Sequence, residues 1–129
     1  MKPDLIYTHV QRRIHPRPTK GLTARLRAAK KAKQSRADRK VYAAVDARDG
    51  LRSRYSGVYK GQAIHRHHIE KRRPGNTTLE NVISLTKHEH LTRIHGLNPT
   101  LRLKGNANIP GGVEVWEKVG GEWLRCPNI

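Results

Sequence analysis

Histidine is the residue type in this sequence that is best suited to chemistry. Six of the eight histidines fall between residues 65 and 95. Imidazole is the commonest metal ligand, and it is the side chain whose unperturbed pKa lies nearest neutrality. A histidine cluster in a basic chain therefore suggests hydrolytic chemistry on phosphate. The six residues are His65, His67, His68, His88, His90 and His95.

Local geometry limits which of the first three histidines can share a site. In a strand, side chains alternate between the two faces, so His65 and His67 point to one face and His68 to the other. A single site that uses both His67 and His68 would need the strand to end between them.

The last three histidines fall on a predicted helix. At about 100° per residue, His88 lies roughly 200° from His90, and His95 roughly 140° from it. One metal ion could therefore bind one of them easily, and two only if the helix were distorted. We expect His90 to serve the site, because the first turn of a helix favours an anionic phosphate. We expect His88 to be exposed and His95 to pack or to bind phosphate.

Two short strands and this helix must position the cluster. Residues 61–70 (GQAIHRHHIE) and 80–85 (ENVISL) are typical of short strands, and a Lys-Arg-Arg-Pro-Gly-Asn loop separates them. Residues 86–96 (TKHEHLTRIHG) predict a helix that ends at Gly96. Thr86 and Glu89 form a capping-box pattern that places the helix start at Lys87.

The N-terminal part of the chain predicts a polyanion partner. The sequence has 27 Lys and Arg against 10 Asp and Glu, a formal charge of +17. Residues 23–48 predict a helix that ends before Gly50, preceded by an irregular basic arm over 1–21. Ala37, Val41 and Val45 form an apolar stripe that can dock on a core. The earlier turns are basic on nearly every face and are expected on phosphate: Arg25, Arg27, Lys30, Lys31, Lys33 and Arg36.

The alternative for this helix is a solvated charged surface without a partner. The scarcity of acidic residues for i, i+4 pairing argues against it. Binding to a membrane surface is disfavoured, since the segment has few Trp, Phe or Leu.

The C-terminal part predicts a β-hairpin. Residues 113–119 (VEVWEKV) and 122–126 (EWLRC) flank Gly120-Gly121, a two-residue hairpin signal. Trp116 and Trp123 would share a face and could pack diagonally, so we expect a structural role. The expected organisation is a basic arm and helix over 1–47, a central motif over 48–97, and a linker plus hairpin over 98–129.

Cysteine and hydropathy exclude several classes of protein. Cys126 is the single cysteine, so neither an internal disulfide nor a cysteine zinc site within one chain can form. There is no apolar signal segment near Met1 and no run of 18 apolar residues. We therefore expect a chain that is neither secreted nor membrane-spanning and that lies in the cytoplasm.

The segment from Arg48 to Gly96 resembles the HNH nuclease family. The ββα-metal motif of that family has a His-His dyad at the end of one strand, an Asn that opens the second strand, and a His on the following helix. The matching residues are His67-His68, Asn81 and His90. The resemblance covers less than half of the 129 residues, but the order and spacing of the motif are fairly specific.

The resemblance implies a role for each matching residue. His67 and His90 would ligate a divalent cation, with Mg²⁺ or Mn²⁺ favoured over Ni²⁺ or Zn²⁺. His68 would be the general base, and Asn81 would hold the loop and orient His68. His95 could be a phosphate or secondary metal contact. Neighbouring basic residues would bind phosphates: Arg66, Lys71, Arg72 and Arg73.

The resemblance also implies a fold and an activity. The fold would be α+β, a small ββα-metal motif between the basic helix and the hairpin. The activity would be metal-dependent cleavage of DNA phosphodiester bonds that leaves 5′-phosphate and 3′-hydroxyl ends. The alternatives are a non-catalytic nucleic-acid-binding protein that retains the HNH fold, and a zinc-binding regulatory module built on the histidines. Each matching residue could also be an ordinary strand, turn or helix residue.

The sequence departs from the family at the structural zinc site. Many HNH proteins hold this zinc on two Cys-x-x-Cys pairs. Ser53 and Ser56 occupy the positions of the first pair, and Thr86 and Glu89 those of the second. No structural zinc is therefore expected, and the stability it would give must come from the docked helix or from the hairpin.

Overall fold

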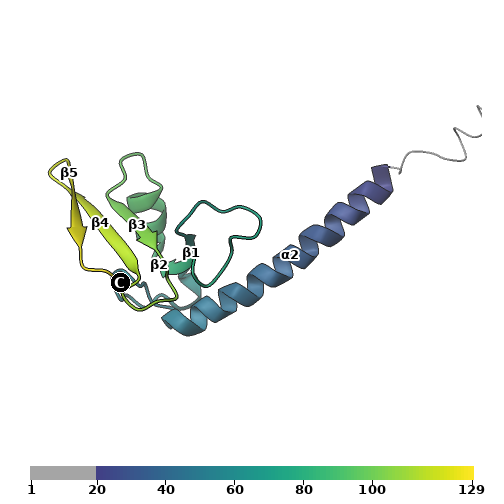
Figure 1. Cartoon of the computed structure of the whole chain (residues 1–129), viewed down its shortest axis with the longest axis horizontal. Coiled ribbons are helices and arrows are strands. Elements are labelled where there is room, and N and C mark those ends of the chain that lie inside the picture. Colours follow the sequence, from purple (N-terminus) through teal and green to yellow (C-terminus); the bar gives the residue numbers. More distant parts are fainter. Residues whose placement is uncertain (1–19) are drawn as a thin grey trace, which may run out of the picture. The chain divides into compact units, whose positions relative to one another are not determined.

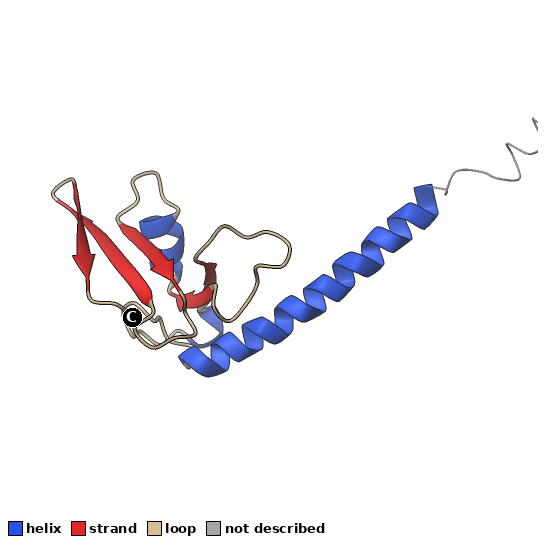
Figure 2. Ribbon diagram, viewed as in Figure 1, coloured by secondary structure: helices blue, strands red, loops and turns tan. Residues whose placement is uncertain are grey.

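The computed structural model describes residues 20–129, and within them the protein mixes helix and sheet (Figures 1 and 2). The elements are helix α2 (Lys20–Asp49), the short 3-10 helix η1 (Gly61–Ala63), strands β1 (His65–His68) and β2 (Val82–Leu85), the π-helix η2 (His88–Ile94), and strands β3 (Leu101–Gly105), β4 (Val113–Val119) and β5 (Glu122–Cys126). The fold class is thus α+β. The basic arm lies, up to residue 19, outside the described residues.

The chain divides into two compact units between Arg36 and Ala37. The described part of the first unit is helix, and its basic side chains from Arg25 to Arg36 are exposed. The second unit contains the last turns of α2 and all five strands. Among the described residues, no helix is both long enough and apolar enough to cross a membrane.

Helix α2 forms where the Ala-, Lys- and Arg-rich run predicts it. It stops at Asp49 because Gly50 adopts a positive φ of 68°. The apolar stripe docks only at its C-terminal end: Val45 is fully buried, Val41 is partly buried, and Ala37 is exposed. The helix therefore contributes one fully buried apolar side chain, that of Val45.

Asp49 joins three parts of the second unit. Its fully buried carboxylate pairs with Arg48 and Arg54 at 2.8 and 3.2 Å and accepts the N–H of Ser84 at 3.0 Å. Burial alone would raise the pKa of Asp49, but the Arg48 guanidinium and the bonds from Ser84 outweigh it and lower the pKa. The carboxylate of Asp49 therefore connects the end of α2 with the following loop and with β2.

Strands β1 and β2 pair antiparallel, with His65 opposite Leu85 and His68 opposite Val82. All four residues of β2 are buried, and Ile83 and Leu85 form the core cluster with Ala107 and Val113. The strand predicted over residues 80–85 is thus present over 82–85, and its burial on both faces suits its mainly apolar sequence.

The C-terminal sheet has three strands in the order β3–β4–β5. The predicted hairpin is present, and both turn residues, Gly120 and Gly121, have positive φ (58° and 82°), as a type I′ turn requires. The prediction of a linker after residue 98 was wrong in part, because Leu101–Gly105 forms β3. Leu101 and Leu103 alternate with Arg102 and Lys104, a pattern too short to stand out beside the Gly/Asn/Pro run.

Three of the four residues at the positions where the HNH resemblance would place zinc-binding cysteines form a hydrogen-bonded cluster. Ser53, which is 2% exposed, donates its hydroxyl to Glu89 Oε1 at 2.5 Å. The same oxygen accepts the N–H of Thr86 at 3.0 Å, and Thr86 Oγ1 accepts the N–H of Glu89 at 3.2 Å. The predicted capping box is therefore present and is extended by Ser53. The side chain of Ser56 is exposed and lies outside this cluster, although its N–H donates to Ser53 Oγ at 3.1 Å.

Candidate metal centre

The helix that carries the last histidines is a π-helix, and this changes which side chains meet. The N–H of His95 donates to the carbonyl of His90 at 3.1 Å, an i to i+5 bond. An α-helix would hold the two residues roughly 140° apart. The wider turn brings their rings to 5.0 Å between centroids. His95 therefore lies beside His90, a position compatible with the secondary metal contact expected of it.

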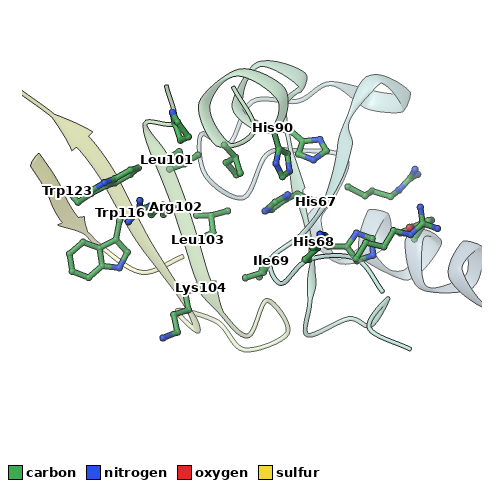
Figure 3. Close-up of a pocket in the computed structure, with 17 residues that line it drawn as sticks. His67, His68, Ile69, His90, Leu101, Arg102, Leu103, Lys104, Trp116 and Trp123 are labelled. Carbon is green, nitrogen blue, oxygen red and sulfur yellow. The ribbon is translucent and has the colours of Figure 1, made fainter. Parts of the chain in front are cut away.

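Three histidines converge from β1 and η2. His67, His90 and His95 each offer one ring nitrogen, and these nitrogens all lie within 4.8 Å of one another. His67 is buried, His90 is half-buried and His95 is exposed, so the cluster opens to solvent on the side of His95. Figure 3 shows His67 and His90 facing each other across the gap between β1 and η2. His88 is exposed, as predicted.

Burial makes two of these histidines good metal ligands. Burial, with smaller contributions from His90, His95 and His68, lowers the pKa of His67 to about 3. Burial, followed by His95, His65 and His68, lowers the pKa of His90 to about 4. Both rings are therefore neutral at neutral pH and keep the lone pair that a metal ion requires.

His67 has a buried nitrogen that nothing satisfies within the described part of the chain. Its Nδ1 is inaccessible and has no hydrogen-bond partner there. Buried polar atoms are normally paired, and an unpaired one is costly. Together with three convergent imidazoles, this fits a transition-metal site, since imidazole nitrogen is a preferred ligand of such ions.

His65 supports the cluster, a role that the sequence did not assign to it. Its Nδ1 lies 3.1 Å from Nδ1 of His90. This contact fixes the orientation of the His90 ring and leaves Nε2 of His90 for another partner. The signal was present in the strand alternation, which places His65 and His67 on one face.

His68 lies on the other face of β1, which does not end between His67 and His68. Its Nε2 lies 2.9 Å from Thr77 Oγ1, and its ring meets Tyr42 edge-on. Burial and the nearby Arg72 lower the pKa of His68, against a smaller opposing effect of Asp38. His67 and His68 nevertheless both line one cavity of about 1230 Å³, here called the groove.

Asn81 closes the loop between β1 and β2. Its side chain accepts the N–H of Glu70 at 2.8 Å and donates to the carbonyls of Glu70 and Asn76 at 3.1 and 2.9 Å. This is the loop-holding geometry expected of it. The hydrogen-bond partner of the His68 ring is Thr77, so any effect of Asn81 on His68 must pass through the loop.

The basic residues beside the dyad differ in their freedom to bind phosphate. Arg66 is paired with both carboxylate oxygens of Asp46, which raises its pKa. Its guanidinium thus already has a carboxylate partner on α2, although it also lines the groove, and its phosphate role stays a prediction. Arg72 is 67% exposed and lies 3.3 Å from Asp38, and Arg73 is paired loosely with Glu70 at 3.7 Å. Lys71 and Arg72 line the groove.

Comparison with known proteins adds no constraint. No protein-family model, curated protein or solved structure matches this chain. The chemistry of the site therefore rests on its residues and their geometry.

Proposed function

We propose that this chain is a metal-dependent DNA endonuclease built on an HNH-type ββα-metal motif. The observation that carries the proposal is the convergence of His67, His90 and His95 within 4.8 Å, in the same groove as a fourth histidine, His68. A net charge of +17 supplies the attraction to a polyanion. Binding of nucleic acid alone would need none of these histidines.

His67, His90 and His95 would hold the cation. When bound, it would neutralise charge that develops on the scissile phosphate and its leaving oxygen. Three imidazole nitrogens favour Ni²⁺ or Zn²⁺ over Mg²⁺, which prefers oxygen ligands. The third histidine therefore moves the preferred cation away from the Mg²⁺ or Mn²⁺ expected for two protein ligands.

His68 would take a proton from the attacking water. A general base must be neutral, and the lowered pKa of His68 keeps it so at neutral pH. If Nε2 donates its proton to Thr77 Oγ1, Nδ1 keeps the lone pair that accepts the proton. Asn81 would act indirectly, by holding the loop between the two strands.

Cleavage of supercoiled plasmid tests the proposal. Wild type, His68→Ala and the control His88→Ala are compared with Mg²⁺, Mn²⁺, Ni²⁺ or Zn²⁺, with and without chelator. His88 is the control because it is an exposed histidine on η2, the helix that also carries His90. We expect chelator to abolish nicking, His68→Ala to slow it by about 10²–10⁴-fold, and His88→Ala to leave it unchanged.

Equal cleavage by wild type and His68→Ala would exclude His68 as the base. DNA binding without cleavage by wild type, with every cation, would favour the non-catalytic nucleic-acid-binding protein instead.

A further inference from the structure

The C-terminal sheet has two faces of different chemistry. Strand pairing places Leu101, Val113 and Val115 on one face, and all three are buried. The opposite face, here called the outer face, has two tryptophans, four cations and one acid. Its residues are Arg102, Lys104, Glu114, Trp116, Lys118, Trp123 and Arg125.

The two indoles are accessible, and an arginine guanidinium of the same sheet lies over each of them. Trp116 and Trp123 are partly exposed and are diagonal neighbours across β4 and β5. The guanidinium of Arg102 lies 4.0 Å from the ring centroid of Trp123, and that of Arg125 lies 5.5 Å from Trp116. Hydrophobic burial does not explain two large aromatic rings on the solvent side of a sheet.

The outer face continues into the groove that contains the histidines. Trp116, Trp123, Arg102 and Lys104 line the same cavity as His67 and His68. Figure 3 shows the two indoles beyond β3 from the histidines, with Leu103 between them and Ile69. Because β3 is an edge strand, an extended chain could pass over it from the indoles to the histidines.

We propose that the outer face binds unpaired nucleotides of the nucleic acid whose backbone reaches the histidines. Bases stack on Trp116 and Trp123, and Lys104, Lys118 and the arginines contact phosphates. The proposal rests on the proposed function for its nucleic-acid partner. It gives the C-terminal hairpin a binding role in addition to the structural role expected from the sequence.

The chemistry favours a single strand over a duplex. Base stacking on aromatic side chains requires exposed base faces, which a duplex conceals between its own pairs. A duplex would need only the cations of this face, and the tryptophans would then have no ligand. Three of the four cations carry no acidic partner on the outer face itself, since Glu114 pairs with Arg125 at 3.6 Å.

Intrinsic fluorescence tests this proposal cleanly, because Trp116 and Trp123 are the only tryptophans in the chain. The 129-residue His68→Ala protein is titrated in the presence of metal, once with a short oligothymidine and once with a duplex. Gel analysis verifies that the oligonucleotide stays intact, and anisotropy of labelled DNA gives the affinity. We expect the single strand to quench the emission and the duplex to quench it much less.

Variants then separate stacking from folding. Trp123→Ala should weaken single-strand binding by about tenfold, and Trp123→Phe should restore most of it. Leu124→Ala, an exposed neighbour on the opposite face of β5, should have no effect.

The proposal would be overturned if the single strand did not bind, or if it bound without quenching the emission. It would also be overturned if Trp123→Ala bound the single strand with wild-type affinity. Equal quenching by duplex would overturn the preference for unpaired nucleotides. None of these results depends on cleavage, whereas failure of the nuclease proposal appears as intact plasmid with wild-type protein.

Discussion

At the scale of single residues, the site is defined by what surrounds each imidazole. His67 is 5% exposed, with a lowered pKa and an unpaired buried Nδ1. The resemblance to the HNH motif paired His67 with His90, and their ring centroids lie 5.1 Å apart. Strand alternation places His65 on the same face as His67, but its contact with His90, 25 positions away in the chain, was not predicted.

His65 should tune metal affinity without binding the metal. We expect His65→Ala to weaken affinity for Ni²⁺ or Zn²⁺ by about 10–100-fold, because the His90 ring loses the contact that orients it. Isothermal titration with His88→Ala as the control measures this. His67→Ala, which removes a ligand, should lose more; equal affinity of His65→Ala and wild type would exclude the orienting role.

At the scale of elements, the π-helix determines which histidines lie close enough to share the candidate metal centre. The spacing of five between His90 and His95 needs a π-turn to bring the rings together, whereas a spacing of four would do so in an α-helix. The sequence predicted a helix here and its N-terminal cap correctly. It could not predict the π-turn, because helix signals do not distinguish i+4 from i+5 bonding.

Deletion of Leu91, an exposed residue of η2, tests this interpretation. We expect the shortened helix to become α-helical, with the two histidines at i, i+4 and metal affinity largely retained. Calorimetry measures the affinity, and circular dichroism the helix. Deletion of Leu91 combined with His95→Ala should lose the affinity; loss in the single deletion would contradict the interpretation.

The hydrogen bonds of Ser53 should stabilise the junction between the loop and η2. Ser53→Ala leaves Glu89 without its hydroxyl partner, and we expect it to lower the free energy of unfolding by about 1–3 kcal/mol. Ser56→Ala is the matched control and should change it by less than about 0.5 kcal/mol. Urea denaturation followed by fluorescence compares them, and equal effects would contradict the role given to Ser53.

Asp49 should make stability depend on acid. Its pKa is lowered below 3.8 in the folded state, so its contribution is present above that pH and is lost as the pH falls through the folded pKa. Asp49→Asn should cost about 3 kcal/mol at pH 7 and flatten the loss of stability below about pH 4. Glu114→Gln, which removes one partner of a surface ion pair, is the control. Denaturation at several pH values measures the free energy of unfolding of both variants. An unchanged acid dependence in Asp49→Asn would contradict the prediction.

At the scale of the whole molecule, the basic turns at the start of α2 and the histidines belong to different units. The exposed basic turns of α2 belong to the first unit, and the histidines and the outer face belong to the second. Charge was readable from composition alone. The sharing of one groove by β1, η2 and the C-terminal sheet was not, because it depends on contacts between segments distant in sequence.

The basic turns should set the salt dependence of DNA affinity. Replacing Lys30, Lys31 and Lys33 by Gln should reduce the slope of log affinity against log salt by about 0.9 for each lysine that contacts a phosphate. Anisotropy over a range of salt concentrations measures the slope, with Lys60→Gln as the single-charge control. An unchanged slope in the triple variant would indicate that this segment is solvated.

The Ser53–Glu89–Thr86 cluster also bears on the surroundings that the fold can tolerate. A zinc–thiolate knuckle is vulnerable to peroxide and to competing chelators, because thiolates oxidise and release the metal. Hydroxyl and carboxylate groups are not oxidised under these conditions, and Cys126 is the only thiol in the chain. Metal starvation should therefore empty the proposed histidine site without unfolding the protein, and oxidative stress should leave the Ser53–Glu89–Thr86 cluster intact.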